Sequence, residues 1–229
     1  DPAGVLPGFD YDVTDENCLL ALKVDNGKLV SPGGIQYRVL VLPNHQTLSL
    51  AALKKVDTLL QQGVQVVGLK PLHLVSLMGG RKAQSVFRRL ADAIWGRDVS
   101  AKGERKYGKG VVAWGISARD FLMSKGLVPD FKVEGNPAAD AFDYIHVEVD
   151  GKQFYFVCNQ TEETQKIACS FRVSGLQPEL WDALNGETRD AKAFSQHDGV
   201  TTLPLCFDPY GSVIICFNRP ISDTAHGET

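Results

Sequence analysis

Three side chains offer chemistry that the rest of the chain could position: Asp10, Asp12 and His146. Asp10 and Asp12 would project to the same side of an extended segment, where two carboxylates can contact a sugar or a metal ion. The alternative is a solvated loop in which Asp residues form turns. We treat both aspartates as candidates for contact with a substrate, and we expect no metal site in this chain.

His146 shares one face of an alternating segment with Glu148. An imidazole at this place could act as a base or as a ligand, because its pKa lies near neutral pH. The alternative is a surface or interdomain residue that only forms hydrogen bonds, as on many solvated strand faces. His146 is therefore the third candidate for contact with a substrate.

The turns that would carry a nucleophile or a phosphate do not contain the necessary residues. Residues 67–71 follow a predicted strand but place no Ser or Cys at the apex of the turn. Residues 44–47 lack the glycines of a phosphate-binding loop. Residues 108–110, Gly-Lys-Gly, precede a strand, whereas a phosphate loop follows one, so they indicate a turn. No catalytic residue is assigned to this chain.

Cysteine spacing and charge exclude further classes of function. The five cysteines are odd in number and contain no Cys-x-x-Cys pair, which argues against a disulfide framework or a zinc site. The formal net charge is −3 and the basic residues are scattered, so we expect no nucleic acid partner. No apolar run approaches the roughly 18–20 residues that cross a bilayer, so we expect no membrane partner. Four cysteines lie in alternating apolar segments and are predicted to be buried thiols: Cys158, Cys169, Cys206 and Cys216.

Residues 1–134 show the pattern of a small α/β domain. The apolar run at 37–43 ends in Pro and is typical of a buried parallel strand. A helix is predicted from a cap at Thr47 or Ser49 to Gly63, followed by a second strand over 64–68. This order predicts a parallel sheet with a right-handed crossover. Similar signals predict a helix ending at Gly96, a strand over 111–114, a short helix over 117–125, and a peripheral strand or hairpin within 9–30 that turns at Asn26-Gly27.

Residues 135–220 change from helical spacing to alternation. Apolar residues alternate over 144–149, and Asp150-Gly151 is a strong hairpin signal before the next run at 153–157. Further alternating runs follow at 167–173, 203–207 and 213–217. Six or seven short strands without helical spacing predict an antiparallel β-sandwich. Residues 221–229 are polar and predicted to be a frayed tail.

A series of short motifs occurs in a fixed order between about residue 8 and residue 219. They include residues 8–12, 25–30, 34–43, 63–71, 108–110, 129–131, 145–146, 154–159 and 171–182. In this order and spacing they resemble the C-terminal region of glycoside hydrolase family 106, the large bacterial alpha-L-rhamnosidases. No single motif is specific, but the ordered set covers nearly the whole chain.

The resemblance implies a longer parent enzyme that removes alpha-linked L-rhamnose from glycans. In that family the catalytic carboxylates, and a calcium requirement, belong to a (β/α)8 barrel outside this segment. The resemblance also implies that the first part is a flavodoxin or class I amidotransferase-like domain without its nucleophile, similar to the trimerisation domain of family 42 beta-galactosidases. The chain starts at Asp1 without an initiator Met, so we expect it to be a piece of a longer protein. The location is unknown from this chain, and the parent enzyme that the resemblance implies is expected to be periplasmic or secreted.

Three hypotheses for function follow. The first is a non-catalytic C-terminal accessory region of a bacterial glycoside hydrolase, with the upstream catalytic barrel and carbohydrate as partners. The second is a freestanding carbohydrate-binding or oligomerisation module, in which the chain would form a homo-oligomer. The third is an independent hydrolase whose site is not recognised. The first two differ in whether a catalytic barrel is encoded upstream of Asp1.

Overall fold

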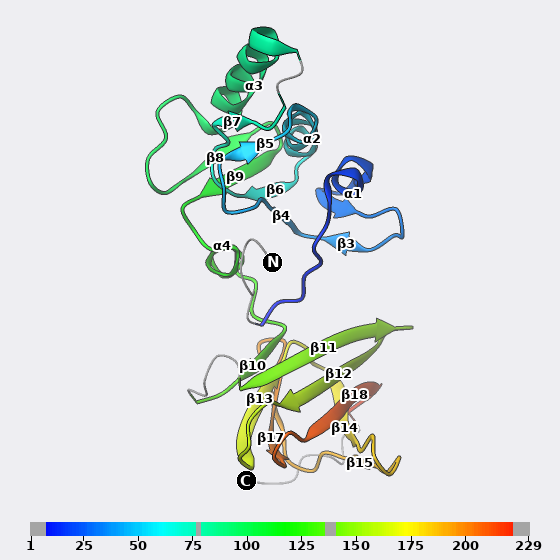
Figure 1. The fold of residues 1–229 in the computed structure, drawn as a ribbon. Coiled ribbons are helices and arrows are strands. Elements are labelled where there is room, and N and C mark those ends of the chain that lie inside the picture. Colours follow the sequence, from blue (N-terminus) through cyan, green and yellow to red (C-terminus); the bar gives the residue numbers. More distant parts are fainter. Residues whose placement is uncertain (1–7, 77–78, 136–140, 222–229) are drawn as a thin grey trace. The chain divides into compact units, whose positions relative to one another are not determined.

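The computed structural model describes residues 8–76, 79–135 and 141–221 (Figure 1). The chain divides into two compact units. The N-terminal unit contains Asp12–Gly126, and the C-terminal unit contains residues 8–11 and 127–221. No helix among these described residues is long and apolar enough to cross a bilayer.

The two units divide earlier in the chain than the expected boundary at residue 134. Strand β10 (Phe131–Val133) pairs antiparallel with β13 (Gln165–Phe171), so it belongs to the C-terminal unit. Phe131 also packs against Phe171, with ring centroids 5.4 Å apart. Sequence pattern could not place this short strand, because its partner lies far along the chain. The expected polar tail falls, after Ile221, outside the described residues.

The N-terminal unit contains a four-stranded sheet in the order β4-β6-β9-β8. Strands β4 (Val39–Val41), β6 (Gln65–Val67) and β9 (Gly110–Trp114) are parallel, which confirms the predicted strand–helix–strand arrangement. Strand β8 (Gly103–Tyr107) pairs antiparallel with β9 and was not predicted, because its exposed centre is polar. The three parallel strands lie side by side in the order in which they occur in the chain.

Capping residues predicted both ends of α2 (Leu50–Gln61) and the start of α4 (Ala118–Ser124) after Ser117. Helix α2 starts after Ser49, whose hydroxyl accepts a hydrogen bond from the Ala52 amide. Gly63, just beyond its end, has φ +106°, a conformation that favours glycine. The other helices are α1 (Glu16–Ala21) and α3 (Gly80–Trp95). Helix α1 was not predicted, because six residues are too few for a helical period.

Small sheets complete the N-terminal unit. The predicted hairpin at Asn26-Gly27 is confirmed, since both residues have positive φ between β1 (Lys23–Asp25) and β2 (Lys28–Val30). Strand β3 (Gln36–Tyr37) extends that sheet, and β5 (Thr47–Leu48) pairs with β7 (His73–Leu74).

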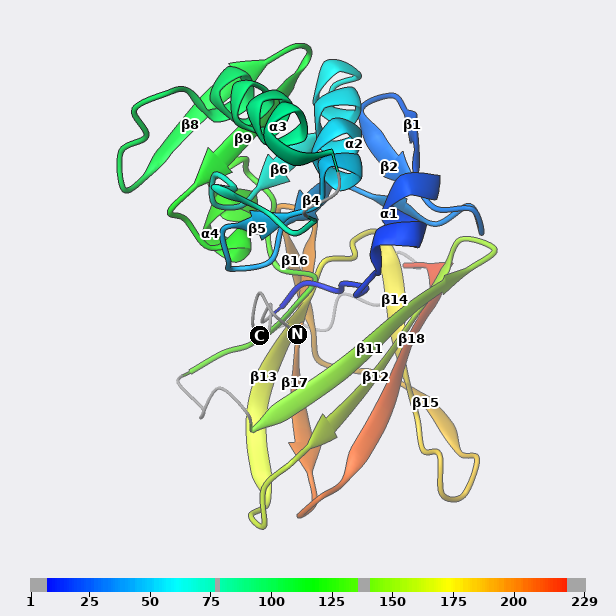
Figure 2. The same ribbon diagram turned by 45° about the horizontal axis from the view of Figure 1, so that its top comes forward.

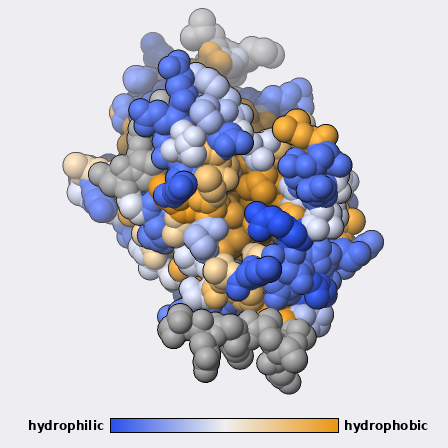
Figure 3. Space-filling model, turned by 90° about the horizontal axis from the view of Figure 1, so that it is seen from below, coloured by the Kyte–Doolittle hydropathy of each residue, from blue (hydrophilic) through white to orange (hydrophobic). Residues whose placement is uncertain are grey.

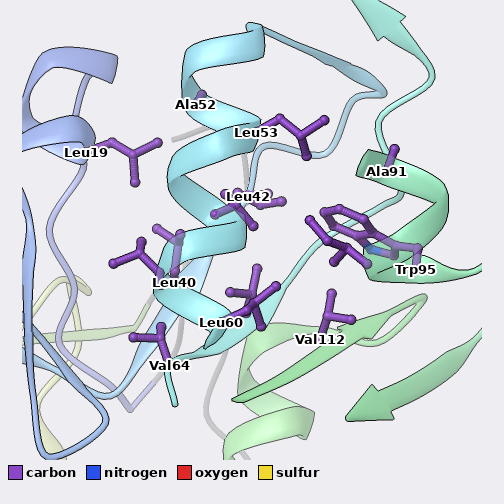
Figure 4. Close-up of a cluster of buried hydrophobic side chains, with 14 of the residues drawn as sticks. Leu19, Leu40, Leu42, Ala52, Leu53, Leu60, Val64, Ala91, Trp95 and Val112 are labelled. Atoms are coloured by element: carbon purple, nitrogen blue, oxygen red, sulfur yellow. The ribbon is translucent and has the colours of Figure 1, made fainter. Parts of the chain in front are cut away.

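Apolar side chains cover both faces of the four-stranded sheet. On one face, Val66 and Val112 pack with α2 and α3 through residues such as Leu53 and Trp95 (Figure 4). On the other face, Val67 and Ala113 pack against Phe121 of α4. Neighbouring residues of one strand therefore point into different layers, as the period of a strand requires.

The C-terminal unit is a sandwich of two antiparallel sheets (Figure 2). Phe171 and Leu203 of one sheet share a core with Tyr155, Ile215 and Phe217 of the other. The four-stranded sheet has the order β10-β13-β17-β16, with β17 spanning Val200–Phe207 and β16 Ser195–His197. The five-stranded sheet has the order β11-β12-β18-β14-β15, spanning Phe142–Val149, Lys152–Asn159, Ser212–Pro220, Leu176–Trp181 and Thr188–Asp190.

The prediction that four cysteines are buried is only partly right. Cys169 and Cys216 are buried, and burial raises the pKa of the Cys169 thiol to about 12. Cys158 is half-buried, and Cys206 is exposed. Cys206 lies on β17 between the inward-facing Leu205 and Phe207, so it points outward. The alternating apolar residues Leu203, Leu205 and Phe207 are the buried ones, and Cys206 belongs to the opposite set, so the prediction for Cys206 was wrong.

Candidate functional site in the C-terminal unit

A buried carboxylate, Asp130, lies just before β10 at the centre of the candidate site. Its backbone amide donates to the Gly8 carbonyl at 2.6 Å, and its carbonyl accepts from the Arg172 amide at 2.9 Å. Gly8 has φ +80°, and a Cβ there would lie 2.8 Å from the Phe131 carbonyl oxygen. A glycine at this position therefore allows the first segment of the unit to reach Asp130.

Three side chains donate hydrogen bonds to the Asp130 carboxylate. His146 Nδ1 lies 2.8 Å from Oδ2, while the Tyr155 hydroxyl and Arg172 Nη2 each lie 3.1 Å from Oδ1. His146 comes from β11 and Tyr155 from the facing position on β12, where their rings stack at 4.0 Å. Two neighbouring strands and the end of β13 thus converge on one carboxylate.

The neighbours of His146 determine its protonation. Its Nδ1 faces the Asp130 carboxylate, and its Nε2 lies 2.6 Å from Gln153 Oε1. Both neighbours are oxygen acceptors in this arrangement, which favours a proton on each ring nitrogen and therefore the imidazolium form. Burial opposes this charge, but the hydrogen bond and the charge of Asp130 outweigh burial and raise the pKa of His146.

The same contacts keep Asp130 ionised. Burial alone would raise its pKa, but the hydrogen bond and charge of His146, together with Arg172, bring the pKa of Asp130 below its usual value. Burial and the Asp130 charge raise the pKa of Tyr155, so its hydroxyl remains a neutral donor. When His146 is protonated, the cluster holds one negative charge, on Asp130, against two positive charges, on His146 and Arg172.

A hollow of about 330 Å³ opens beside this cluster. Asp130, His146 and Arg172 line it together with Glu148, and Val173 and Leu176 form part of its wall. About a third of the Arg172 side chain is exposed, so it has N–H groups left over from its bond to Asp130. A glycosidase acid needs a carboxyl group whose pKa is raised, and Asp130 has the opposite shift. The arrangement fits hydrogen bonding of a polar ligand better than proton transfer.

The structure brings one of the three predicted residues to this hollow, and that residue is His146. Asp10 is exposed in the C-terminal unit, and its carboxylate accepts from the next amide, of Tyr11. Asp12 belongs to the N-terminal unit, where it accepts a 2.5 Å hydrogen bond from the Tyr37 hydroxyl. The two aspartates lie in no strand, so the reason for expecting them on one side is lost.

Sequence reasoning did not identify Asp130, Gln153, Tyr155 or Arg172 as site residues. These residues come from three separate segments and meet only when the strands pair. The usable signal was a polar residue at the end of an apolar strand, as for Arg172 after Phe171. Among the described residues, no three His, Cys, Asp or Glu side chains gather as a metal site.

A second hollow, of about 350 Å³, lies in the N-terminal unit beyond the carboxyl ends of β6 and β9. Lys70 lines this hollow and belongs to the turn at residues 67–71, which has no Ser or Cys at its apex. Its ammonium group donates to Asp92 Oδ1 at 2.7 Å and to the carbonyls of Gly96 and Arg97 at 2.6 and 3.1 Å. These three acceptors use all three N–H groups, so Lys70 ties the end of α3 to this turn.

Comparison with known proteins relates the whole chain to glycoside hydrolases. A putative beta-glucuronidase from Formosa agariphila is 36% identical over 213 residues, which cover 93% of this chain and 17% of that protein. The structure of a rhamnosidase from Novosphingobium sp. PP1Y superposes with a TM-score of 0.88 at 27% identity, covering 97% of this chain and 21% of the rhamnosidase. The chain thus spans about a fifth of the length of these relatives. The family model for alpha-L-rhamnosidases of glycoside hydrolase family 106 matches residues 3–195, so the chain belongs to that family.

Proposed function

We propose that this chain is a non-catalytic accessory region of a longer bacterial glycoside hydrolase of the alpha-L-rhamnosidase type. The observation that carries the proposal is the state of Asp130, the buried carboxylate of the main hollow. Three donors bind its two oxygens and its pKa is lowered, so it stays ionised and is unsuited to supply the proton that a leaving sugar needs. The other described carboxylates with shifted pKa values, Asp15 and Glu134, are also shifted downward.

The catalytic carboxylates then belong to a barrel elsewhere in the longer enzyme, together with any calcium ion. In this proposal the N-terminal unit is an amidotransferase-like domain that has lost its nucleophile. Three parallel strands with helices on both faces support that assignment, and Lys70 occupies the turn where a nucleophile would stand. The role of this unit is architectural.

The hollow beside Asp130 supplies the carbohydrate contact of the accessory region. Arg172 offers spare N–H donors, and Glu148 offers a carboxylate acceptor on the same hollow. A sugar hydroxyl both donates and accepts, so an Arg and a carboxylate together suit a pair of neighbouring hydroxyls. Val173 and Leu176 would face the apolar side of the sugar ring. In this role Arg172 and Glu148 bind, while Asp130 and His146 position Arg172.

The alternative is a freestanding carbohydrate-binding module. Both hypotheses place the carbohydrate in the hollow beside Asp130. A freestanding module would bind it without any other domain, whereas the accessory region would not. The discriminating quantity is the affinity of the purified 229-residue chain for rhamnose-containing oligosaccharides, measured by NMR titration. Millimolar affinity or weaker, with stronger binding by the longer enzyme, favours the accessory region. Micromolar affinity of the chain alone favours the freestanding module, because its site is then complete.

The proposal is tested by hydrolysis of an aryl alpha-L-rhamnoside. We expect the longer enzyme to release the aryl group and the purified 229-residue chain to release none above buffer. Two matched variants show whether any residual hydrolysis comes from the hollow: Glu148→Gln changes a residue of the hollow, and Glu187→Gln changes an exposed residue elsewhere. Hydrolysis by the chain that Glu148→Gln abolishes and Glu187→Gln preserves would sink the proposal in favour of an independent hydrolase.

A further inference from the structure

The outward side of the five-stranded sheet is apolar across four strands. Register pairs Ile145 with Phe156, Phe156 with Ile214, and Ile214 with Trp181, so these side chains form one row on one face. The next row contains Val147 opposite Phe154. The inward face carries the alternate residues, including buried Tyr155 and Ile215. We call the following residues the outer apolar face: Ile145, Val147, Phe154, Phe156, Ile214 and Trp181.

Several of these side chains are exposed to an extent that soluble sheets avoid. Ile145 is 61% exposed, Val147 48% and Phe156 38%. In the space-filling view, apolar side chains gather together on the surface and polar side chains border them (Figure 3). Scattered apolar residues need no explanation, but a contiguous apolar area marks an interaction surface. A sheet that is apolar on both faces is typical of one covered on both faces.

The edges of the two sheets support this reading. Strands β10, β16 and β15 are edge strands in the described part of the chain, and each is only three residues long. Short edge strands protect a sheet from pairing with other chains. The fourth edge strand, β11, is eight residues long and contributes Ile145 and Val147 to the outer apolar face. Three edge strands are thus short, whereas the long edge strand β11 borders the outer apolar face.

We propose that the outer apolar face docks against an apolar surface of another domain of the same, longer polypeptide. This inference rests on the proposed function. The chain spans 17% and 21% of its two relatives, so most of each relative lies outside the matched region. A tethered domain is present at an effective concentration of about millimolar, far above that of a second copy in solution. A second copy of this chain would therefore occupy the outer apolar face less than a tethered domain does.

The test measures how fast a thiol on the face reacts with a maleimide. Val147→Cys places the thiol on the face, and Cys18→Ser removes an exposed thiol elsewhere. Cys206 is exposed on β17, outside this sheet, and serves as the internal control. Labelling is followed by peptide mass spectrometry in the 229-residue chain and in the full-length polypeptide. We expect Cys at 147 to react at least about tenfold more slowly in the full-length polypeptide, while Cys206 changes less, because reactivity follows exposure.

Equal labelling of residue 147 in both proteins would overturn the proposal, as would a gene that encodes no further domain. Sedimentation of the 229-residue chain, with and without Val147→Lys, tests the competing occupant. A monomer at tens of micromolar supports a tethered domain, since a self-complementary face of this kind would dimerise at roughly that concentration. A dimer that Val147→Lys dissociates would assign the face to a second copy instead. Thiol labelling does not depend on rhamnoside hydrolysis, so failure of this proposal and of the proposed function can be told apart.

Discussion

Lys70 and Asp130 are both charged side chains that are nearly excluded from solvent, and each is held by three partners. The Lys70 side chain is 10% exposed in the N-terminal unit, and the Asp130 side chain is 4% exposed in the C-terminal unit. Lys70 is held by a carboxylate and two backbone carbonyls. Asp130 is held by three side chains, of which one titrates near neutral pH.

The difference lies in what each cluster can still do. All three N–H groups of Lys70 are used, so that cluster has no donor left for a ligand and acts as a fixed tie. Two partners of Asp130, His146 and Arg172, line a hollow, and Arg172 keeps unused donors. A saturated buried charge is therefore no sign of a binding site by itself. A binding site is indicated when the partners of the buried charge face solvent and still have unused hydrogen-bond donors or acceptors.

The largest effect that separates the two clusters should come from Asp130→Asn. It leaves two positive partners, His146 and Arg172, without their counterion, and should lower the free energy of unfolding of the C-terminal unit by about 3–5 kcal/mol. Native-state hydrogen exchange measures this on peptides from β17, with peptides from α2 reporting the N-terminal unit. The control Asp143→Asn replaces an exposed carboxylate on β11. Unchanged exchange in β17 would show that the Asp130 cluster does not hold the sandwich together.

Lys70→Met should have a smaller effect, confined to the other unit. Met keeps the apolar stem but leaves two carbonyls without a donor, at a cost of about 1–3 kcal/mol to the N-terminal unit. Asp92 loses its ion pair, but part of its side chain reaches solvent and can be hydrated. Lys109→Met, at an exposed hairpin position, is the matched control. Faster exchange in α3 but not in β17 is expected, whereas faster exchange in both would mean that the two units unfold together.

Local signals predicted the elements that surround these clusters. The apolar run, the Ser49 cap and Gly63 predicted α2 and its flanking parallel strands, and Asp150-Gly151 predicted the β11–β12 hairpin. Strand β8 was missed because Glu, Arg and Lys occupy its exposed positions. Helical and strand periods are local properties, so they identify elements and leave their partners open.

The candidate site could be predicted only in part, for the same reason. His146 was found because it alternates with apolar residues on a strand. Asp130 and Arg172 were missed because nothing local distinguishes them from surface charges. They become a site only when β13 brings Arg172 beside the residue that precedes β10. Asp10 and Asp12 were chosen because an extended segment would place both carboxylates on one side, and the structure assigns neither residue to a strand.

The pH dependence of stability should also differ between the units, by less than the substitutions above. The pKa of His146 is raised, so its contribution is fully present below its unfolded pKa and is lost as pH rises through the folded value. The pKa of Asp130 is lowered, so its contribution is present above its unfolded pKa and is lost as pH falls through the folded value. The C-terminal unit should therefore lose stability as pH rises above the ordinary histidine pKa of about 6.5 and through the raised folded pKa of His146.

His146→Gln is the variant that tests this origin. It should flatten the loss of stability in that range for β17 and leave the exchange of α2 unchanged. Thermal unfolding at a series of pH values, with exchange as the unit-specific readout, provides the measurement. A pH dependence that persists in the variant would assign it to groups other than the His146–Asp130 pair.

The smallest effect on stability, and the sharpest test of what distinguishes the hollow, is expected for Glu148→Gln. Glu148 is exposed at the hollow, so its replacement should change the free energy of unfolding by no more than about 0.5 kcal/mol. A glutamine is a weaker acceptor than a carboxylate, so the loss of one charge-assisted hydrogen bond should weaken rhamnoside binding by roughly tenfold. NMR titration of the longer enzyme with a rhamnoside measures that change, with Glu187→Gln as the exposed control. If both variants bind alike, Glu148 does not contact the sugar, and the pairing of an Arg with a carboxylate in this hollow is not a sugar site.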